Sequence, residues 1–85
     1  MATDALVHPG ELIADELEER KMTQRDLAEA MGRPAYMVNG IVRGRRRVTA
    51  AVALDLERVW ATPAEVWMNL QAKYDLAVAR RNVAG

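Results

Sequence analysis

The sequence contains no cysteine, no serine and no phenylalanine, and it has a single histidine among its 85 residues. Without cysteine the chain can form neither a disulfide nor a thiolate zinc site, so nothing favours a secreted, cross-linked domain. The commonest nucleophiles are missing, and one histidine cannot build a multi-histidine metal centre. We therefore expect no enzyme, no metal or other cofactor, and no small-molecule substrate.

Long apolar runs are also absent. No stretch approaches the roughly 20 apolar residues that a transmembrane helix needs. The first 20 residues are acidic and lack the apolar segment of a signal peptide. A chain of 85 residues is near the lower size limit for a core that is stable without cross-links. These features predict a single domain over residues 1–85, located in the cytoplasm and without a membrane partner.

The net charge is zero, but the charges are unevenly distributed along the chain. Residues 1–19 carry six acidic side chains and no basic one, whereas residues 20–47 carry eight basic and two acidic side chains. Such a separation is typical of a protein with a basic surface for nucleic acid and an acidic surface for another partner. Ordinary solvated helix faces give the same pattern, so charge alone leaves both interpretations open.

Helix-forming residues dominate the sequence, and no segment alternates apolar and polar residues as a half-buried strand would. Thr23 and Thr49 are expected N-caps, and Thr62 with Glu65 has the spacing of a capping box. The pattern predicts an all-α fold of five helices joined by short loops. The expected helices cover residues 9–20, 23–32, 34–43, 49–60 and 63–82.

The second and third expected helices have the spacing of a helix-turn-helix over residues 23–43. Ala28 lies four residues before Gly32, and Val38 lies six residues after it, which suits a close helix crossing at a glycine turn. In such a unit the second helix enters the major groove of DNA. An ordinary helical hairpin with a glycine turn has the same spacing. The outward side of the third helix would carry Tyr36, Asn39, Gly40 and Arg43.

Several longer runs match one known family. They include HPGE at 8–11, TQRDLA at 23–28, GRP at 32–34, ALDL at 53–56 and TPAEVWMNLQ at 62–71. On these runs, which span about residues 8 to 76, the chain resembles the HigA-type antitoxins of the Cro/phage-repressor (XRE) helix-turn-helix family. The resemblance implies a lambda-repressor-like domain and a homodimer that binds double-stranded operator DNA. It also implies a basic RelE/HigB-like toxin, a ribosome-dependent mRNA interferase, as protein partner.

The resemblance also indicates which side chains meet DNA. Relatives contact phosphate at the positions of Gln24 and Arg25, and bases from positions 35 to 39. They commonly carry Arg, Ser or Gln at 35 to 37, which this chain does not, and Gly40 replaces a better helix former at a cost of about 1 kcal/mol relative to Ala. The predicted DNA contacts are Thr23, Gln24, Arg25, Arg33, Ala35, Tyr36, Met37, Asn39, Arg43, Arg45, Arg46 and Arg47.

Four of these residues form an arginine segment at 43–47, directly after the third helix. Arginines that neutralise phosphates release counterions, which gives affinity without sequence information. The alternative is a solvated basic loop, or one whose arginines pair with Asp55 and Glu57.

The first helix carries an acidic face that also has two interpretations. It is either a solvated face, paired with Arg20 or Lys21, or a surface that attracts a basic toxin by charge complementarity. The predicted toxin-binding residues are Asp15, Glu16, Glu18 and Glu19.

The last helix has an apolar stripe that continues beyond what a core of this size needs. Its predicted dimer contacts are Leu70, Tyr74, Ala77 and Val78. Trp60 and Trp67 are expected in the core and His8 at the start of the first helix. Asn69 and Gln71 are expected to bond to loop backbone or to a neighbouring subunit.

The residues and the resemblance together predict a sequence-specific DNA-binding antitoxin that represses its own operon and neutralises a RelE/HigB-like toxin. Two alternatives remain open. One is a stand-alone repressor, encoded by a phage or mobile element, with no toxin partner. The other is a helical adaptor that binds only protein, an interpretation supported by Ala35, Met37 and Gly40 on the reading face.

Overall fold

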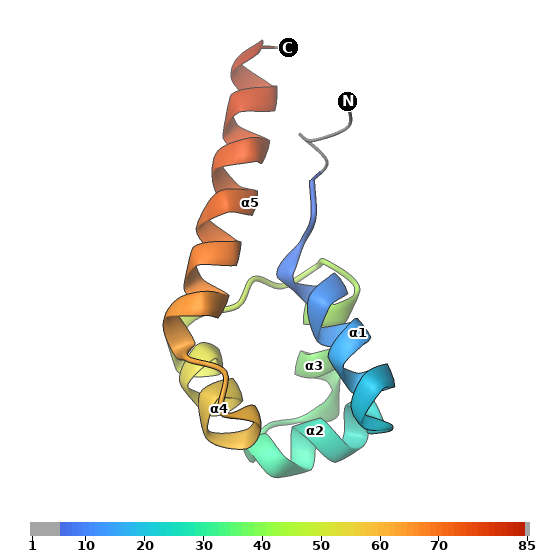
Figure 1. The fold of residues 1–85 in the computed structure, drawn as a ribbon. Helices are drawn as coiled ribbons and strands as arrows, with labels where there is room; N and C mark the ends of the chain where they lie inside the picture. The colour runs from blue at the N-terminus through green and yellow to red at the C-terminus, as the bar shows by residue number, and fades with distance from the viewer. Residues whose placement is uncertain (1–5, 85) are drawn as a thin grey trace.

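The computed structural model describes residues 6–84, and within this range the chain forms five α-helices and no strand (Figure 1). The predicted all-α, five-helix fold is confirmed. The helices are α1 (Pro9–Arg20), α2 (Gln24–Met31), α3 (Ala35–Val42), α4 (Ala50–Trp60) and α5 (Ala64–Ala84).

Threonine caps begin two of the helices, as the sequence predicts. Thr23 Oγ1 accepts from the backbone N–H of Asp26 at 3.0 Å, and the Asp26 carboxylate accepts from the N–H of Thr23 at 3.0 Å. Thr49 Oγ1 accepts from the N–H of Val52 at 3.3 Å. These bonds satisfy N–H groups that the first turn of a helix leaves without a partner.

The start of α5 differs from its prediction. Neither hydrogen bond of the expected capping box between Thr62 and Glu65 forms among the described residues. Instead, the N–H of Ala64 donates to Glu57 Oε2 on α4 at 3.2 Å. The capping-box prediction was wrong because a carboxylate from a neighbouring helix satisfies this terminus.

The core draws apolar side chains from all five helices. Val48, in the loop between α3 and α4, is fully buried although the helix pattern did not predict it. Gly10 allows α1 to touch α3, since a Cβ at this position would lie 1.8 Å from the carbonyl oxygen of Ile41. The buried apolar residues are Ile13, Leu17, Leu27, Ala28, Met31, Val38, Ile41, Val48, Val52, Ala53, Leu56, Trp60 and Trp67.

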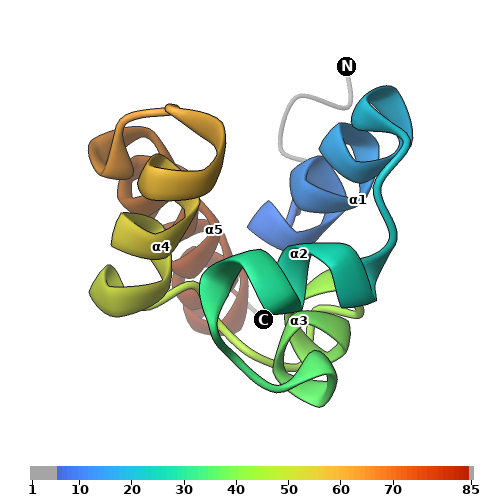
Figure 2. The ribbon, with the colours of Figure 1, turned by 90° about the horizontal axis from the view of Figure 1, so that it is seen from below.

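Helix α2 packs on α3 and α4, whereas α1 packs on α3 and α5. Seen from below, α2 and α3 lie nearest the viewer, with α1 and α4 to either side (Figure 2). Helix α5 packs on α4, and its second half extends beyond the other helices (Figure 1). The described residues therefore measure 40 × 21 × 21 Å. Among them, no helix combines the length and the apolar character needed to cross a membrane.

Candidate nucleic-acid interface

Helices α2 and α3 form the predicted helix-turn-helix. Gly32 has φ of 72°, the left-handed conformation that favours glycine, and ends α2. The N–H of Arg33 then donates to the carbonyl of Ala28 at 3.0 Å, which closes the turn. Ala28 and Val38 are each 2% exposed, so the two residues expected to fix the helix crossing are buried.

The outer face of α3 presents few polar groups. Tyr36 is 68% exposed, which agrees with its prediction as a surface residue rather than a core residue. Ala35 is also exposed, whereas Met37 is partly buried against the core. Of the three predicted base contacts at 35 to 37, Met37 is therefore the least available to DNA.

Asn39 on this face is hydrogen-bonded to the start of α2. Its Nδ2 donates to Gln24 Oε1 at 3.1 Å, which joins the two helices of the motif. Asn39 keeps its carbonyl oxygen and one N–H, the two groups that a bidentate contact with adenine requires. Gln24 keeps its own N–H groups, which suit a phosphate oxygen.

The arginine segment, residues 43–47, folds back onto the end of α3. Gly44 has φ of 76°, and the N–H groups of Arg45 and Arg46 both donate to the carbonyl of Gly40, at 2.8 and 3.1 Å. The Arg46 guanidinium carbon lies 5.4 Å from the centre of the Tyr36 ring, a distance at which a cation is attracted to an aromatic face. The segment is therefore attached to the outer surface of α3.

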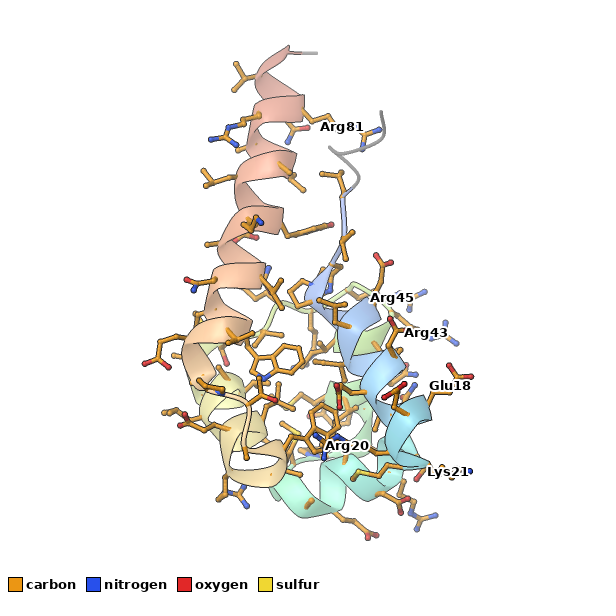
Figure 3. All side chains as sticks on the ribbon, viewed as in Figure 1. Glu18, Arg20, Lys21, Arg43, Arg45 and Arg81 are labelled. Carbon is orange, nitrogen blue, oxygen red and sulfur yellow. The ribbon has the colours of Figure 1, made fainter. Side chains whose placement is uncertain are left out.

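The partners of the arginine segment differ from the two carboxylates that its alternative interpretation named. Arg47 pairs with Asp75 on α5 at 2.8 Å. Arg43 and Arg45 are exposed and point to the same side of the molecule as α1 (Figure 3). The alternative in which these arginines pair with Asp55 and Glu57 is not realised, since Asp55 pairs with Arg33 and Glu57 accepts from the N–H of Ala64.

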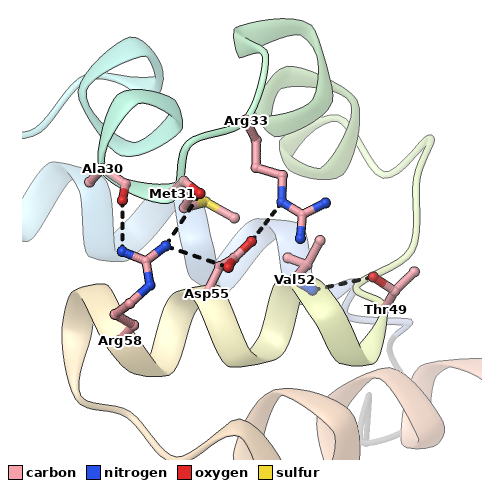
Figure 4. Close-up of polar contacts among 7 residues, drawn as sticks. All are labelled: Ala30, Met31, Arg33, Thr49, Val52, Asp55 and Arg58. Atoms are coloured by element: carbon pink, nitrogen blue, oxygen red, sulfur yellow. Dashed lines mark hydrogen bonds and ion pairs between the residues drawn. The ribbon is translucent and has the colours of Figure 1, made fainter.

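Asp55 lies at the centre of a polar cluster that joins α4 to the turn of the motif (Figure 4). Its Oδ2 pairs with Arg33 Nε at 2.6 Å, and its Oδ1 with Arg58 Nη2 at 3.5 Å. Arg58 also donates to the carbonyls of Ala30 and Met31, at 3.1 and 3.3 Å, and so satisfies the C-terminus of α2. Arg33, a predicted DNA contact, thus has one N–H committed to Asp55 and only its terminal N–H groups left for phosphate.

Gln71 connects α5 to the backbone that follows the arginine segment. Its side chain is 1% exposed, and its Oε1 accepts from the N–H of Val48 at 2.7 Å. Its Nε2 donates to Asp75 Oδ1 at 3.0 Å, while Asp75 Oδ2 accepts from Arg47. The prediction that Gln71 bonds to loop backbone is confirmed. The role of Asp75 was not foreseen, because its loop partner is 28 residues away in the sequence.

His8 caps α1, as its position predicts. Its Nδ1 accepts from the N–H of Gly10 at 2.9 Å, and its ring packs edge-on against Tyr74 at 4.9 Å between centroids. Burial lowers the pKa of His8 below its usual 6.5, against the opposing effects of Glu11, a backbone hydrogen bond with Arg46, and Asp75. His8 is therefore a structural residue, buried in its neutral form.

The acidic face of α1 is partly neutralised by its own helix. Glu16 Oε1 bonds to Arg20 Nε at 2.6 Å, and the Arg20 guanidinium lies 5.1 Å from the Trp60 ring centre. Asp15, Glu18 and Glu19 are exposed. These three carboxylates are therefore accessible to solvent and to a partner protein. Within residues 6–84, no group of three or more histidine, aspartate or glutamate side chains is arranged so that it could hold a metal ion.

The predicted dimer contacts on α5 are divided between two environments. Leu70 is partly buried against the core, and Tyr74 packs against His8. Ala77 and Val78 are half-buried. Among the large apolar side chains of α5, Leu76 and Val83 are the most exposed, at 51% and 87%. They share one face of α5 with Ala79 and Arg80.

Comparison with known proteins identifies relatives by sequence and by structure, although no protein-family model matches the sequence. Virulence-associated protein I of Dichelobacter nodosus is 36% identical over 77 residues, which cover 89% of this chain and 71% of that protein. An addiction module antidote protein of the HigA family from Coxiella burnetii has a similar structure, with a TM-score of 0.89 and 38% identity over 93% of this chain and 87% of that one.

A second solved structure is the Pseudomonas aeruginosa antitoxin HigA with the higBA promoter. Its TM-score is 0.89 and its identity 42%, and the match covers 92% of this chain and 86% of that one. These relatives agree with the prediction of a regulator rather than an enzyme. The sequence matches and the shared arrangement of the five helices give one conclusion: the chain belongs to the HigA family of helix-turn-helix antitoxins.

Proposed function

We propose that this protein binds the operator DNA of its own operon, represses transcription there, and neutralises a toxin encoded beside it. The observation that carries the DNA-binding half is the position of the arginine segment. Arg46 lies against Tyr36, so cationic groups and the exposed side of α3 form one continuous surface. A DNA duplex that receives α3 in its major groove would meet the exposed Arg43 and Arg45 at its phosphates. The P. aeruginosa relative was solved with the higBA promoter, which supports the proposal that this chain binds promoter DNA.

Repression needs two copies of α3, because symmetric operators present two half-sites about 34 Å apart. We place the dimer contact on the second half of α5. Leu76 and Val83 are exposed there, on a part of the helix that extends beyond the core (Figure 1). Operator occupancy by such a dimer would exclude polymerase from the promoter.

Fluorescence anisotropy with the full chain tests DNA binding. The probes are the DNA upstream of its gene and a shuffled duplex of equal length, each titrated between 50 and 200 mM salt. We expect the upstream DNA to bind at least about 10³-fold more tightly. The logarithm of its association constant should fall with the logarithm of salt concentration with a slope of several units. Equal affinity for both duplexes would refute sequence-specific binding and favour the protein-binding adaptor.

The toxin-binding half rests on the exposed carboxylates of α1, Asp15, Glu18 and Glu19. A toxin that acts on ribosome-bound mRNA needs a basic surface, and complementary charge speeds association and disfavours wrong partners. Charge complementarity between α1 and the toxin would therefore allow the same chain to bind DNA with α3 and the toxin with α1.

Co-expression with the product of the adjacent small open reading frame tests this half. We expect a complex that a triple change of Asp15, Glu18 and Glu19 to Asn or Gln weakens, mainly through slower association. Glu65→Gln, an exposed change on α5, is the control for a lost negative charge. If the neighbouring product does not bind, the stand-alone repressor becomes the better description.

A further inference from the structure

We propose that Arg46 determines operator specificity by contacting the edge of a guanine from the surface of α3, and is not a sequence-independent phosphate contact. This inference rests on the proposed DNA-binding function and adds a residue that lies outside the recognition helix. It also revises the interpretation of the arginine segment as a uniform set of phosphate contacts.

The side chain of Arg46 runs back along α3, against the direction of the chain. Its backbone N–H is fixed to the carbonyl of Gly40 at 3.1 Å. Its Cγ and Cδ lie 3.0 and 2.9 Å from the place where a Cβ of Gly40 would be. Its guanidinium then reaches the ring of Tyr36, one helical turn nearer the start of α3.

Glycine at position 40 leaves room for this path, because a Cβ there would lie within 3.0 Å of the Arg46 side chain and would require it to shift. A mid-helix glycine lowers helix stability relative to alanine, so a glycine there needs a compensating reason. The hydrocarbon part of Arg46 occupies the space that any larger residue would fill. Gly40 and Tyr36 are four residues apart and share one side of the helix, so together they form a track for the arginine.

The end of this track is where a recognition helix meets bases. Tyr36 is the second residue of α3, and the N-terminal residues of a recognition helix contact base edges. The neighbouring Ala35 and Met37 have no polar side-chain group that could select a base pair. Arg46 supplies the missing donors, because an arginine bonded to guanine O6 and N7 is the commonest specific contact in the major groove.

Arg46 is also chemically available for this contact. Arg33 and Arg47 are paired with Asp55 and Asp75, whereas no carboxylate within the described residues pairs with Arg46. The contact with Tyr36 is between the cation and the ring, at 5.4 Å from the ring centre, and it leaves guanidinium N–H groups free to donate. An arginine that is already positioned loses less conformational entropy on binding than a free one.

The test compares Arg46→Ala with Arg45→Ala in the full-length protein. Arg45 is exposed, carries the same charge and is in the same loop, so it is a matched control. For each protein the measurement is the ratio of affinities for the upstream DNA and a shuffled duplex. We expect Arg46→Ala to lower this ratio roughly 5- to 150-fold, the range for one bidentate base contact. We expect Arg45→Ala to weaken both duplexes equally and to leave the ratio unchanged.

Gly40→Ala tests whether the position of Arg46 matters, because it moves this side chain without removing its charge. The added methyl must displace Arg46, yet alanine favours the helix, so we expect a higher Tm together with a lower specificity ratio. Replacement of the operator G·C pairs one at a time should reveal one pair that matters to the wild type and no longer matters to Arg46→Ala.

The results separate this inference from the proposed function. If the wild type prefers its upstream DNA but Arg46→Ala and Arg45→Ala have equal ratios, Arg46 is a phosphate contact and the inference fails alone. If Gly40→Ala keeps the full ratio, the track along α3 is not what positions the arginine, and the inference fails as well. A wild-type protein that does not distinguish the two duplexes overturns the proposed function itself.

Discussion

Replacement of Gln71 by leucine is expected to destabilise the whole domain, because this buried side chain has a polar role. Leucine is close to glutamine in size, so it removes hydrogen-bonding groups without opening a large cavity. The N–H of Val48 loses its acceptor, which now lies 2.7 Å away, and Asp75 loses a donor at 3.0 Å. Val48 is itself fully buried, so water cannot readily replace Gln71 as the acceptor for the Val48 N–H.

The expected loss follows from that single unsatisfied group. A buried donor without a partner costs about 1–3 kcal/mol. A domain of 85 residues has a total free energy of unfolding of roughly 4–13 kcal/mol, so the change removes a large fraction of it. At roughly 4–8 °C per kcal/mol, the Tm should fall by at least about 4 °C.

Urea denaturation followed by tryptophan fluorescence measures this loss, because Trp60 and Trp67 are buried in the core. Asn69→Leu is the matched control, since Asn69 is exposed on the same helix and its change should stay within about 0.5 kcal/mol. Gln71→Leu should show the larger loss at an unchanged m-value. Equal stabilities for the two variants would refute the reasoning, because the Val48 N–H would then have an adequate partner without Gln71.

Three further predictions concern pH, backbone conformation and charge. The pKa of His8 is lowered, so the unfolded chain binds more protons than the native one, and the free energy of unfolding should fall as the pH drops below about 6.5. His8→Asn, which keeps a capping acceptor, should reduce the dependence of Tm on pH between pH 7.5 and 5. The same pH dependence in the variant and the wild type would contradict this prediction. Ala61 has φ of 63°, a left-handed conformation that glycine adopts more easily than alanine, so Ala61→Gly should stabilise the domain by about 0.5–1 kcal/mol. Ala51→Gly inside α4 should destabilise the domain by a similar amount, and urea denaturation measures both changes. Asp55→Asn should lower the free energy of unfolding by about 1–2 kcal/mol, because it breaks the ion pair with Arg33. The same change should raise the affinity for shuffled DNA, because Arg33 can then reach phosphate, and an unchanged affinity by fluorescence anisotropy would contradict this.

Local sequence signals were sufficient for the helices and for the helix-turn-helix. Thr23 and Thr49 mark two helix starts because a threonine hydroxyl bonds to an N–H only three residues away. Gly32 marks the turn because the left-handed conformation is intrinsic to glycine. Such signals depend on residues that are neighbours in the chain, so they can be interpreted without the fold.

The sequence by itself thus determined an all-α chain with a basic recognition unit, and the family to which it belongs. Only the tertiary structure decided which arginines are neutralised and which remain available. Arg33 meets Asp55 across 22 residues, Arg47 meets Asp75 across 28, and Arg46 returns along α3 because Gly40 leaves room for it. The same applies to Glu57, which replaces the expected cap of α5. The physical reason is that a charge selects its partner by distance in space, and the packing of helices sets that distance.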